Sequence, residues 1–171
     1  QHWTLGVVPI AASEVHIRPT QSLTIEGADH PVEVWQLRLG AEGEGLAELL
    51  VREEGPLRAT NGVIIERQGQ LTSLNGFITA DIVNSGVIAS QPLTVDGSFT
   101  QLSTGVLRAV LIPQTTSVVS RPATISGTLE VTVANGANIP VGTVFELVRA
   151  RDIRGAFGQI VDLTGLGLKL E

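Results

Sequence analysis

The sequence predicts an all-β protein, a β-solenoid with a C-terminal cap, and three observations lead to this fold class. The first is a repeated pattern in which a glycine turns the chain and an aliphatic residue two positions later can point inward. It occurs at Gly55-Pro56-Leu57, Gly69-Gln70-Leu71, Gly86-Val87-Ile88, Gly105-Val106-Leu107 and Gly127-Thr128-Leu129. The second is the steps of 14, 17, 19 and 22 residues between these glycines, close to one solenoid coil. The third is a composition of 43 % hydrophobic but only 4 % aromatic residues, which predicts an aliphatic core of stacked strands.

Length and charge restrict the class of protein further. A chain of 171 residues fits one domain, and a charged fraction of 16 % argues against disorder. The net charge is −6 and Lys169 is the only lysine, which argues against binding to a nucleic-acid backbone. The sequence has no cysteine, and therefore neither a disulfide framework nor a thiolate metal site. It has no run long enough for a transmembrane helix, and its start at Gln1 is compatible with a signal peptide already removed.

Residues 1–54 are expected to form N-terminal strands and to cap one end of the solenoid. Their first part, residues 3–17, alternates only weakly between apolar and polar side chains. Residues 23–26 then predict a short strand, because β-branched and aliphatic residues are followed directly by a turn cluster at residues 27–31.

The clearest alternation of period two lies at residues 32–39 and predicts a strand. One parity carries Trp35, Leu37 and Leu39, and we expect this face to point inward. Residues 46–51 have a composition that suits a helix, but their position between solenoid-like turns predicts a strand instead.

Residues 55–112 carry the most regular repeats and are expected to form the regular coils. Their turn signals are Asn61-Gly62, Asn75-Gly76, Asn84-Ser85-Gly86 and Asp96-Gly97, and the strands expected between them cover residues 63–66, 77–83, 93–95 and 106–112. Asn-Gly and Asp-Gly also favour tight hairpins, so an antiparallel β-sandwich is the structural alternative. The short, unequal spans between turns and the polar pair Asn84-Ser85 favour the parallel arrangement.

The remaining residues, 113–171, are expected to form the terminal coils and the cap. A Ser/Thr-rich connection is predicted over residues 113–122, followed by strands at residues 128–134, 144–150, 159–162 and 167–171. An open terminal coil would expose unpaired backbone groups, so the end must be closed. We expect the aromatic rings of Phe99, Phe145 and Phe157 to close it.

A set of short segments repeats the same order of turn and strand over residues 55–171. These segments are Asn61-Gly62-Val63-Ile64, Asn84-Ser85-Gly86-Val87-Ile88, residues 93–101, Gly105-Val106-Leu107, residues 125–131, residues 142–147 and residues 153–157. In them the sequence resembles bacterial surface-exposed and secreted parallel β-helix proteins, including autotransporter passengers. The resemblance implies an all-β, right-handed parallel β-helix at the cell surface or outside the cell. Most such proteins are scaffolds, adhesins or matrix components. The sequence reaches Glu171 without an autotransporter's membrane barrel, so an independent extracellular subunit is an equal expectation.

The histidines are the first candidates for chemistry. His2, His16 and His30 all lie in the first 30 residues, and His16 could approach Asp29 or His30 if the N-terminal strands pair. No established ligand spacing is present, so exposed or partly packed histidines are the preferred interpretation. We therefore predict no metal and no cofactor.

The other motifs favour structural interpretations as well. Asp96-Gly97-Ser98 is predicted to be a turn, since the residue order of an aspartic protease is absent. The glycine-rich loop at residues 40–45 is acidic and would repel a phosphate, and no Gly-x-Ser-x-Gly nucleophile motif occurs. Glu66, Asp81 and Asp96 could line an acidic groove for glycan cleavage, but the sequence offers no aromatic platforms to stack sugars. Solvated acids on the outer surface are the preferred interpretation.

A cluster of arginines lies near the C-terminal end, at Arg149, Arg151 and Arg154. Salt bridges at the surface are the preferred interpretation. The alternative is a basic patch that meets the acidic region of a neighbouring copy, and each exposed pair would then add only about 0–1 kcal/mol. The residues of that acidic region are Glu42, Glu44, Glu53 and Glu54.

Together these observations predict a non-catalytic, extracellular structural or adhesive surface protein. It is expected to self-associate through the solenoid ends or edge strands, into filaments or a surface layer. The alternative from another class is a carbohydrate-binding or carbohydrate-active module, with a cell-surface glycan as partner. A third and weaker alternative is an antiparallel sandwich that acts as a binding module.

Overall fold

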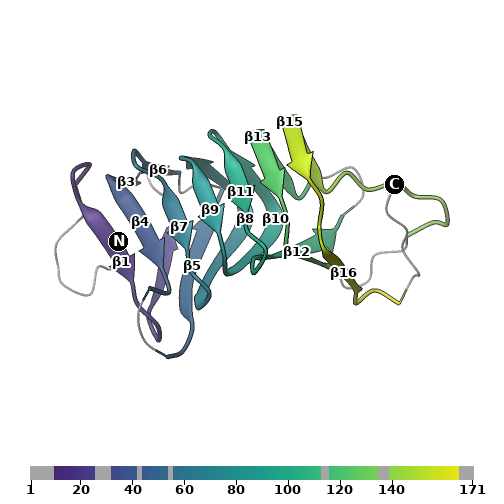
Figure 1. Ribbon diagram of the computed structural model, residues 1–171, viewed down its shortest axis with the longest axis horizontal. Coiled ribbons are helices and arrows are strands. Elements are labelled where there is room, and N and C mark those ends of the chain that lie inside the picture. Colours follow the sequence, from purple (N-terminus) through teal and green to yellow (C-terminus); the bar gives the residue numbers. More distant parts are fainter. Residues whose placement is uncertain are drawn as a thin grey trace.

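The computed structural model describes residues 10–25, 32–41, 44–53, 56–112, 116–134 and 139–165. This part of the chain is all-β, with 61 % of its residues in strands and none in a helix. The strands form one large sheet, and every pair between described strands is parallel. The antiparallel β-sandwich is therefore wrong. Figure 1 shows the strands side by side along the long axis, from the N-terminal strands to β15 and β16.

The pairing divides the strands into three rows. The first row contains β2 (Ser22–Ile25), β5 (Ala47–Arg52), the start of β8 (Gly69–Thr79), the start of β10 (Val87–Val95), β12 (Val106–Leu111), β14 (Thr128–Val133) and β16 (Gln159–Asp162). The second row contains β3 (Val32–Val34), β6 (Leu57–Ala59), the ends of β8 and β10, and the starts of β13 (Val118–Ile125) and β15 (Val148–Gly155). The third row contains β1 (Glu14–Ile17), β4 (Gln36–Leu39), β7 (Val63–Ile65), β9 (Ile82–Asn84), β11 (Phe99–Gln101), and the ends of β13 and β15.

A column of glycines lies where the chain enters the first row. It contains Gly69, Gly86, Gly105 and Gly127, four of the five glycines in the repeated sequence pattern. A Cβ atom at Gly86 would lie 2.1 Å from the carbonyl oxygen of Glu66 and 2.3 Å from that of Gly69. Only a residue without a side chain allows the backbones of successive passes to approach this closely.

The aliphatic residue two positions after each of these glycines lies in the core. Leu71, Ile88, Leu107 and Leu129 have no exposed surface, and each pairs in register with the next. The glycine-x-aliphatic prediction is therefore confirmed for these four. In the fifth, Gly55 lies outside the described residues, and Leu57 is buried in the second row instead.

The predicted strand at residues 32–39 is divided at Trp35. Leu37 and Leu39 are buried as predicted, but Trp35 is 43 % exposed, so its predicted inward position is wrong. The backbone bends at Trp35 where the chain passes from the second row to the third, and this bend resets the alternation. Val34 and Leu37 consequently both face the core, and the indole between them lies at the corner.

Phe99 is fully buried in β11, in the middle of the third row. It pairs with Ile82 of β9 and Ala123 of β13, so the prediction that it closes an end is wrong. Phe145 and Phe157 are partly buried against the core, beside the last strands of the sheet, where the sequence placed them. In the third row Phe99 replaces the smaller aliphatic residues found at equivalent positions of neighbouring strands.

Several strand predictions are confirmed with shifts of one or two residues, and others need correction. The confirmed predictions are residues 23–26 (β2), 46–51 (β5), 63–66 (β7), 106–112 (β12), 128–134 (β14) and 159–162 (β16). Residues 77–83 are instead the end of β8 and the start of β9, residues 93–95 end the longer β10, and the strand predicted at 144–150 begins only at Val148. The predictions for residues 3–9, 27–31 and 167–171 lie outside the described residues.

Two connections were also predicted differently from what the structure shows. Asn75-Gly76 lies inside β8, because Asn75 adopts a φ of 56° that bends the strand from the first row into the second without ending it. The connection predicted over residues 113–122 ends early, since β13 begins at Val118. Val118 is fully buried, and the burial of this side chain brings the segment onto the sheet.

A buried polar pair connects the third row with the next corner. Asn84 and Gln101 are paired neighbours in β9 and β11, and the Asn84 Nδ2 group lies 3.3 Å from Gln101 Oε1. Gln101 Nε2 donates to the carbonyl oxygens of Ser126 and Thr128, both at 3.1 Å. These bonds satisfy buried amides that would otherwise be costly, and they join successive passes as the prediction of stacked polar turns required.

Candidate functional site

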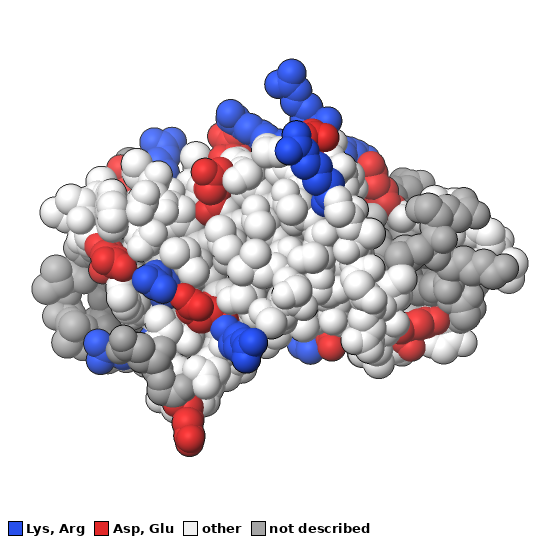
Figure 2. Space-filling view, in the orientation of Figure 1, with Lys and Arg blue, Asp and Glu red and all other residues white. Residues whose placement is uncertain are grey.

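A shallow, open pocket lies on the outer surface of the third row, towards the N-terminal end. We name it the charged pocket; its volume is about 410 Å³ and its lining residues are His16, Arg38, Gly40, Ala41, Glu66, Arg67 and Gln68. Figure 2 shows acidic and basic side chains alternating over this part of the surface, next to a broad area without charges. The pocket combines side chains from three passes of the chain, on β1, on β4 and after β7.

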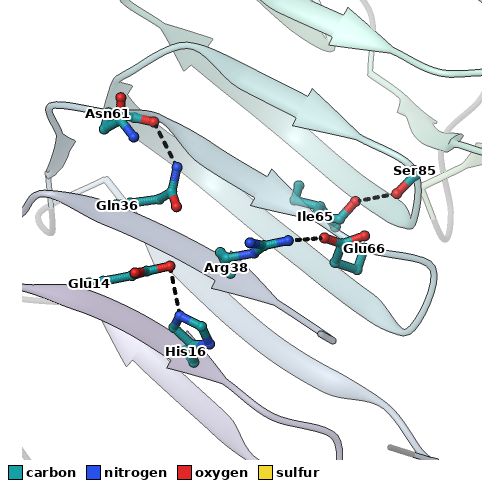
Figure 3. Close-up of polar contacts among 8 residues, drawn as sticks. All are labelled: Glu14, His16, Gln36, Arg38, Asn61, Ile65, Glu66 and Ser85. Carbon is teal, nitrogen blue, oxygen red and sulfur yellow. Dashed lines mark hydrogen bonds and ion pairs between the residues drawn. The ribbon is translucent and has the colours of Figure 1, made fainter. Parts of the chain in front are cut away.

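The strand register places the charged groups of the pocket next to one another. His16 pairs with Arg38, and Nε2 of His16 lies 2.8 Å from Oε1 of Glu14. Arg38 Nη2 donates to Oε1 of Glu66 at 2.7 Å (Figure 3). Arg38 Nε is buried and has no hydrogen-bond partner in the described part of the chain. Arg67 is exposed and likewise makes no hydrogen bond or ion pair there.

Strand β4 continues the same surface towards the exposed indole of Trp35. Gln36 and Arg38 alternate with the buried Leu37 and Leu39, so both point to the outer surface. Gln36 Nε2 donates to the carbonyl oxygen of Asn61 at 3.2 Å, which Figure 3 shows beside the Arg38 contact. The alternation of residues 36–39 contained the signal for the outward Arg38, but no sequence signal placed Arg67 in the same pocket or predicted that Trp35 is exposed.

The three acids proposed for a groove are not brought together. Asp81 precedes β9 and Glu66 follows β7, so they lie at opposite ends of these paired strands. Each carboxylate has its own partner. These partners are Arg38 for Glu66, Ser98 for Asp81, and Arg121 for Asp96, whose Oδ1 lies 2.7 Å from the Nε of the arginine. The acidic groove considered as the alternative for glycan cleavage is therefore not formed by these three residues.

The histidines and the Asp-Gly-Ser motif lie in separate parts of the structure. His16 is exposed beside Glu14, whereas His2, Asp29 and His30 lie outside the described residues. In the described segments no three His, Asp or Glu side chains gather as metal ligands would. Asp96-Gly97-Ser98 is a turn between β10 and β11, as predicted.

Asp81 carries the clearest electrostatic perturbation of this corner. The backbone N–H of Ser98 donates to Asp81 Oδ1 at 2.8 Å and the Ser98 hydroxyl donates to the same oxygen at 2.7 Å. These bonds, the backbone bond first, lower the pKa of Asp81 below its ordinary value of 3.8, against a smaller opposing effect of burial.

We therefore expect Asp81 to make folding stability depend on pH in acid. A carboxyl group whose pKa is lower in the native state stabilises the fold above the unfolded pKa, and this stabilisation is lost as the pH falls through the native pKa. Replacing Asp81 with Asn should lower the melting temperature near neutral pH, with the difference from wild type shrinking as the pH falls below 3.8. Thermal unfolding followed by circular dichroism measures this. Parallel pH profiles for the two chains would contradict the assigned role.

The arginine cluster lies on β15 and is largely neutralised. Arg149 pairs with Glu146, and Arg154 Nε lies 3.0 Å from Oδ2 of Asp152. The hydrogen bond from Arg149 lowers the pKa of Glu146, with a smaller contribution from Thr116. Arg151 makes no ion pair within the described ranges, and Figure 2 shows basic side chains projecting near β13 and β15. The salt-bridge interpretation is thus confirmed for Arg149 and Arg154.

The C-terminal end of the sheet exposes aliphatic side chains. Among the described strands, β15 and β16 each pair on one side only. Ile160 of β16 continues the buried column of the first row, yet it is 44 % exposed. The other exposed aliphatic residues here are Val141, Val144, Ile153 and Leu163. Of the acidic residues proposed as a complementary surface, Glu44 and Glu53 are exposed, and Glu42 and Glu54 lie outside the described residues.

Comparisons with protein-family models, with curated proteins and with solved structures found no match to this chain. The described part of the chain contains no helix that is long and apolar enough to span a membrane. The functional conclusions therefore depend on the geometry of the sheet and its surfaces.

Proposed function

We propose that the parallel sheet is a right-handed β-helix, a β-solenoid that forms one domain over residues 1–171. The order of the strands supports this, because the chain visits the third, first and second rows in turn and each pass pairs with the pass before it. Connections between parallel strands of one sheet are right-handed in almost all proteins, which supports the hand. Residues 1–54 then form the N-terminal passes, residues 55–112 the regular coils, and residues 113–171 the terminal coils and cap.

On this fold we propose a non-catalytic structural or adhesive protein, exported to the cell surface or beyond. One observation carries the proposal: a column of aliphatic side chains continues without exposure through successive passes of the first row. Its members are Leu49, Leu71, Ile88, Leu107 and Leu129. Each pass adds about 4.8 Å to a continuous core, so the product is a stiff rod with two ends. The resemblance to bacterial β-helix scaffolds and adhesins supports the same conclusion.

We further propose that the rod associates with copies of itself through its C-terminal end. Edge strands with unpaired backbone groups and exposed aliphatic side chains favour pairing with another chain. β15 and β16 have both features in the described part of the protein, and Ile160 stands at the end of the buried column. Ends that meet without closing a ring would produce filaments or a layer.

Sedimentation velocity over a concentration series tests this association. We expect wild type to form larger species as the concentration rises, and Ile160→Lys to remain monomeric, because a charge on an edge strand opposes pairing. Leu102→Lys is the matched control, since Leu102 is 41 % exposed but lies after β11 in the middle of the rod. A wild-type chain that stays monomeric at every concentration would contradict the proposal. Equal effects of the two lysines would show a general charge effect and would contradict association through this end.

A second candidate function is a carbohydrate-binding module. The exposed indole of Trp35 favours it, because an exposed aromatic ring can stack against a sugar and Trp35 directly precedes β4, the strand that carries Arg38 of the charged pocket. The two functions are compatible in an adhesive rod, in which one surface binds a glycan and one end binds another copy.

A further inference from the structure

We propose that the surface from Trp35 to the charged pocket binds an oligosaccharide that carries carboxylate groups. This inference rests on the second candidate function and names its ligand class and its site. Two independent observations carry it: the indole of Trp35 is 43 % exposed just before β4, and a pocket lined by Arg38 of that strand also holds the exposed guanidinium of Arg67, which makes no hydrogen bond or ion pair within the described residues.

The first observation concerns the cost of exposing Trp35. Leaving a large part of an indole in water forfeits stabilisation that burial would supply, and 43 % of Trp35 is exposed. Its backbone is held firmly, because the N–H of Trp35 donates to Ser13 at 2.8 Å and its carbonyl oxygen accepts from Asn61 at 2.6 Å. An exposed indole on a fixed backbone is a flat apolar surface, against which the C–H face of a sugar ring can pack.

The second observation concerns the donors of the pocket. Glu14 and Glu66 are already bound by His16 and Arg38, whereas Arg67 makes no contact of this kind within the described residues. Arg38 Nε is buried and its Nη2 is bound to Glu66, so the donors open to a ligand are those of Arg67. Guanidinium groups bind carboxylates through two parallel hydrogen bonds, a geometry that suits a uronic acid better than a neutral sugar.

The spacing of the two features determines the size of the ligand. Trp35 directly precedes β4, and the three residues from it to Arg38 correspond to about 10 Å of backbone. Gln36 lies between them on the same outer face and supplies an amide that can hydrogen-bond to hydroxyl groups. A single sugar cannot reach from the indole to the pocket, so the site requires an oligosaccharide.

Calorimetric titration with a trisaccharide of galacturonic acid tests the assignment, with maltotriose as the neutral probe. We expect saturable binding of the acidic trisaccharide only, weakened by salt because the contacts are partly exposed. Arg67→Gln and Trp35→Ala should each weaken binding about tenfold. Arg151→Gln is the matched control, an equally unpaired arginine within the described chain on β15, and should leave the affinity unchanged. In a Trp3→Phe background, Trp35 is the only indole, so its fluorescence should change on binding.

Each of the other outcomes overturns a defined part of the inference. Absence of saturable binding, or equal weakening by Arg67→Gln and Arg151→Gln, would overturn the site. Equal affinity for maltotriose, lost in Trp35→Ala, would overturn the carboxylate class while leaving the carbohydrate-binding function intact. The melting temperature of each variant shows whether its fold is retained. We expect both variants to fold, because the side chains of Trp35 and Arg67 are exposed. Self-association is measured without glycan. A chain that does not self-associate is therefore distinguishable from a chain that does not bind the acidic oligosaccharide.

Discussion

Replacing Gly86 with alanine is expected to lower the free energy of unfolding by about 3 kcal/mol or more. The new Cβ atom would lie 2.1 Å from the carbonyl oxygen of Glu66 and 2.3 Å from that of Gly69, distances that no rotamer can relieve. Both obstacles are backbone atoms of the preceding pass, so the passes must separate. Separation would lengthen the hydrogen bond from the Ser85 N–H to the Ile65 carbonyl, now 2.8 Å, and would disturb the next pass too, because Val106 donates to the Gly86 carbonyl.

The matched control for this substitution is Gly158→Ala in the same column. Gly158 directly precedes β16, as Gly86 directly precedes β10, and its N–H donates to the Gly127 carbonyl oxygen, but a Cβ atom there would lie 3.7 Å from its nearest neighbour. Neither Gly86 nor Gly158 has a positive φ, so the two substitutions differ in available space. We expect Gly158→Ala to change stability by less than about 1 kcal/mol. Urea unfolding followed by circular dichroism measures both.

If Gly86→Ala yields no folded protein, Gly105→Ala provides a graded test. A Cβ atom at Gly105 would lie 2.6 Å from the Asn84 carbonyl oxygen, a less severe overlap than at Gly86. We expect its destabilisation to fall between those of Gly86→Ala and Gly158→Ala. Similar stabilities for all three variants would show that the close stacking of passes at this corner is wrong.

Replacing Phe99 with alanine should destabilise the protein by about 3–5 kcal/mol. Phe99 has no exposed surface and is the largest of the fully buried side chains, lying between Ile82 and Ala123 of the neighbouring strands. Removing the ring leaves a cavity that neighbouring passes cannot close, because their backbones are held in register by hydrogen bonds on both sides. The same unfolding measurement gives the change.

Phe99→Leu separates the cavity from loss of hydrophobicity. Leucine retains an apolar side chain of intermediate volume at the same position, so we expect a loss clearly smaller than for alanine. The expected ranking contradicts the original prediction that Phe99 closes an end, since an end position would tolerate either substitution with a loss near or below about 1 kcal/mol. A small effect of Phe99→Ala would therefore support the prediction that Phe99 closes an end of the solenoid. It would contradict the register in which Phe99 pairs with Ile82 and Ala123.

Local sequence signals predicted the parts of the fold that depend on neighbours in the chain. The column positions require glycine because the backbones of successive passes are in close contact there. The aliphatic residue two positions later faces inward because side chains alternate along a strand. Leu71 and Ile88 show both effects and are buried as predicted. The turn at Asn84 was also predicted correctly, since its side-chain oxygen accepts a hydrogen bond from the Gly86 N–H, two residues later in the same turn.

Corners between rows could not be predicted from alternation. At Trp35 a bend resets the parity, and at Asn75 a left-handed residue redirects β8 without ending it. A sequence pattern records the residue types that favour a turn, but the same Asn-Gly pair is compatible with a hairpin and with a corner of a parallel sheet. The choice depends on which strand lies alongside, and this is a tertiary contact.

The candidate site shows the same division. The sequence by itself determined an all-β chain with an aliphatic core and a glycine repeat, because these properties follow from composition and from spacing along the backbone. Only the tertiary structure decided that His16, Arg38 and Glu66 share one pocket and that Trp35 is exposed. His16, Arg38 and Glu66 belong to three different passes, and passes of unequal length bring them together through strand register. Register is set by the packing of the whole sheet, which no local segment specifies.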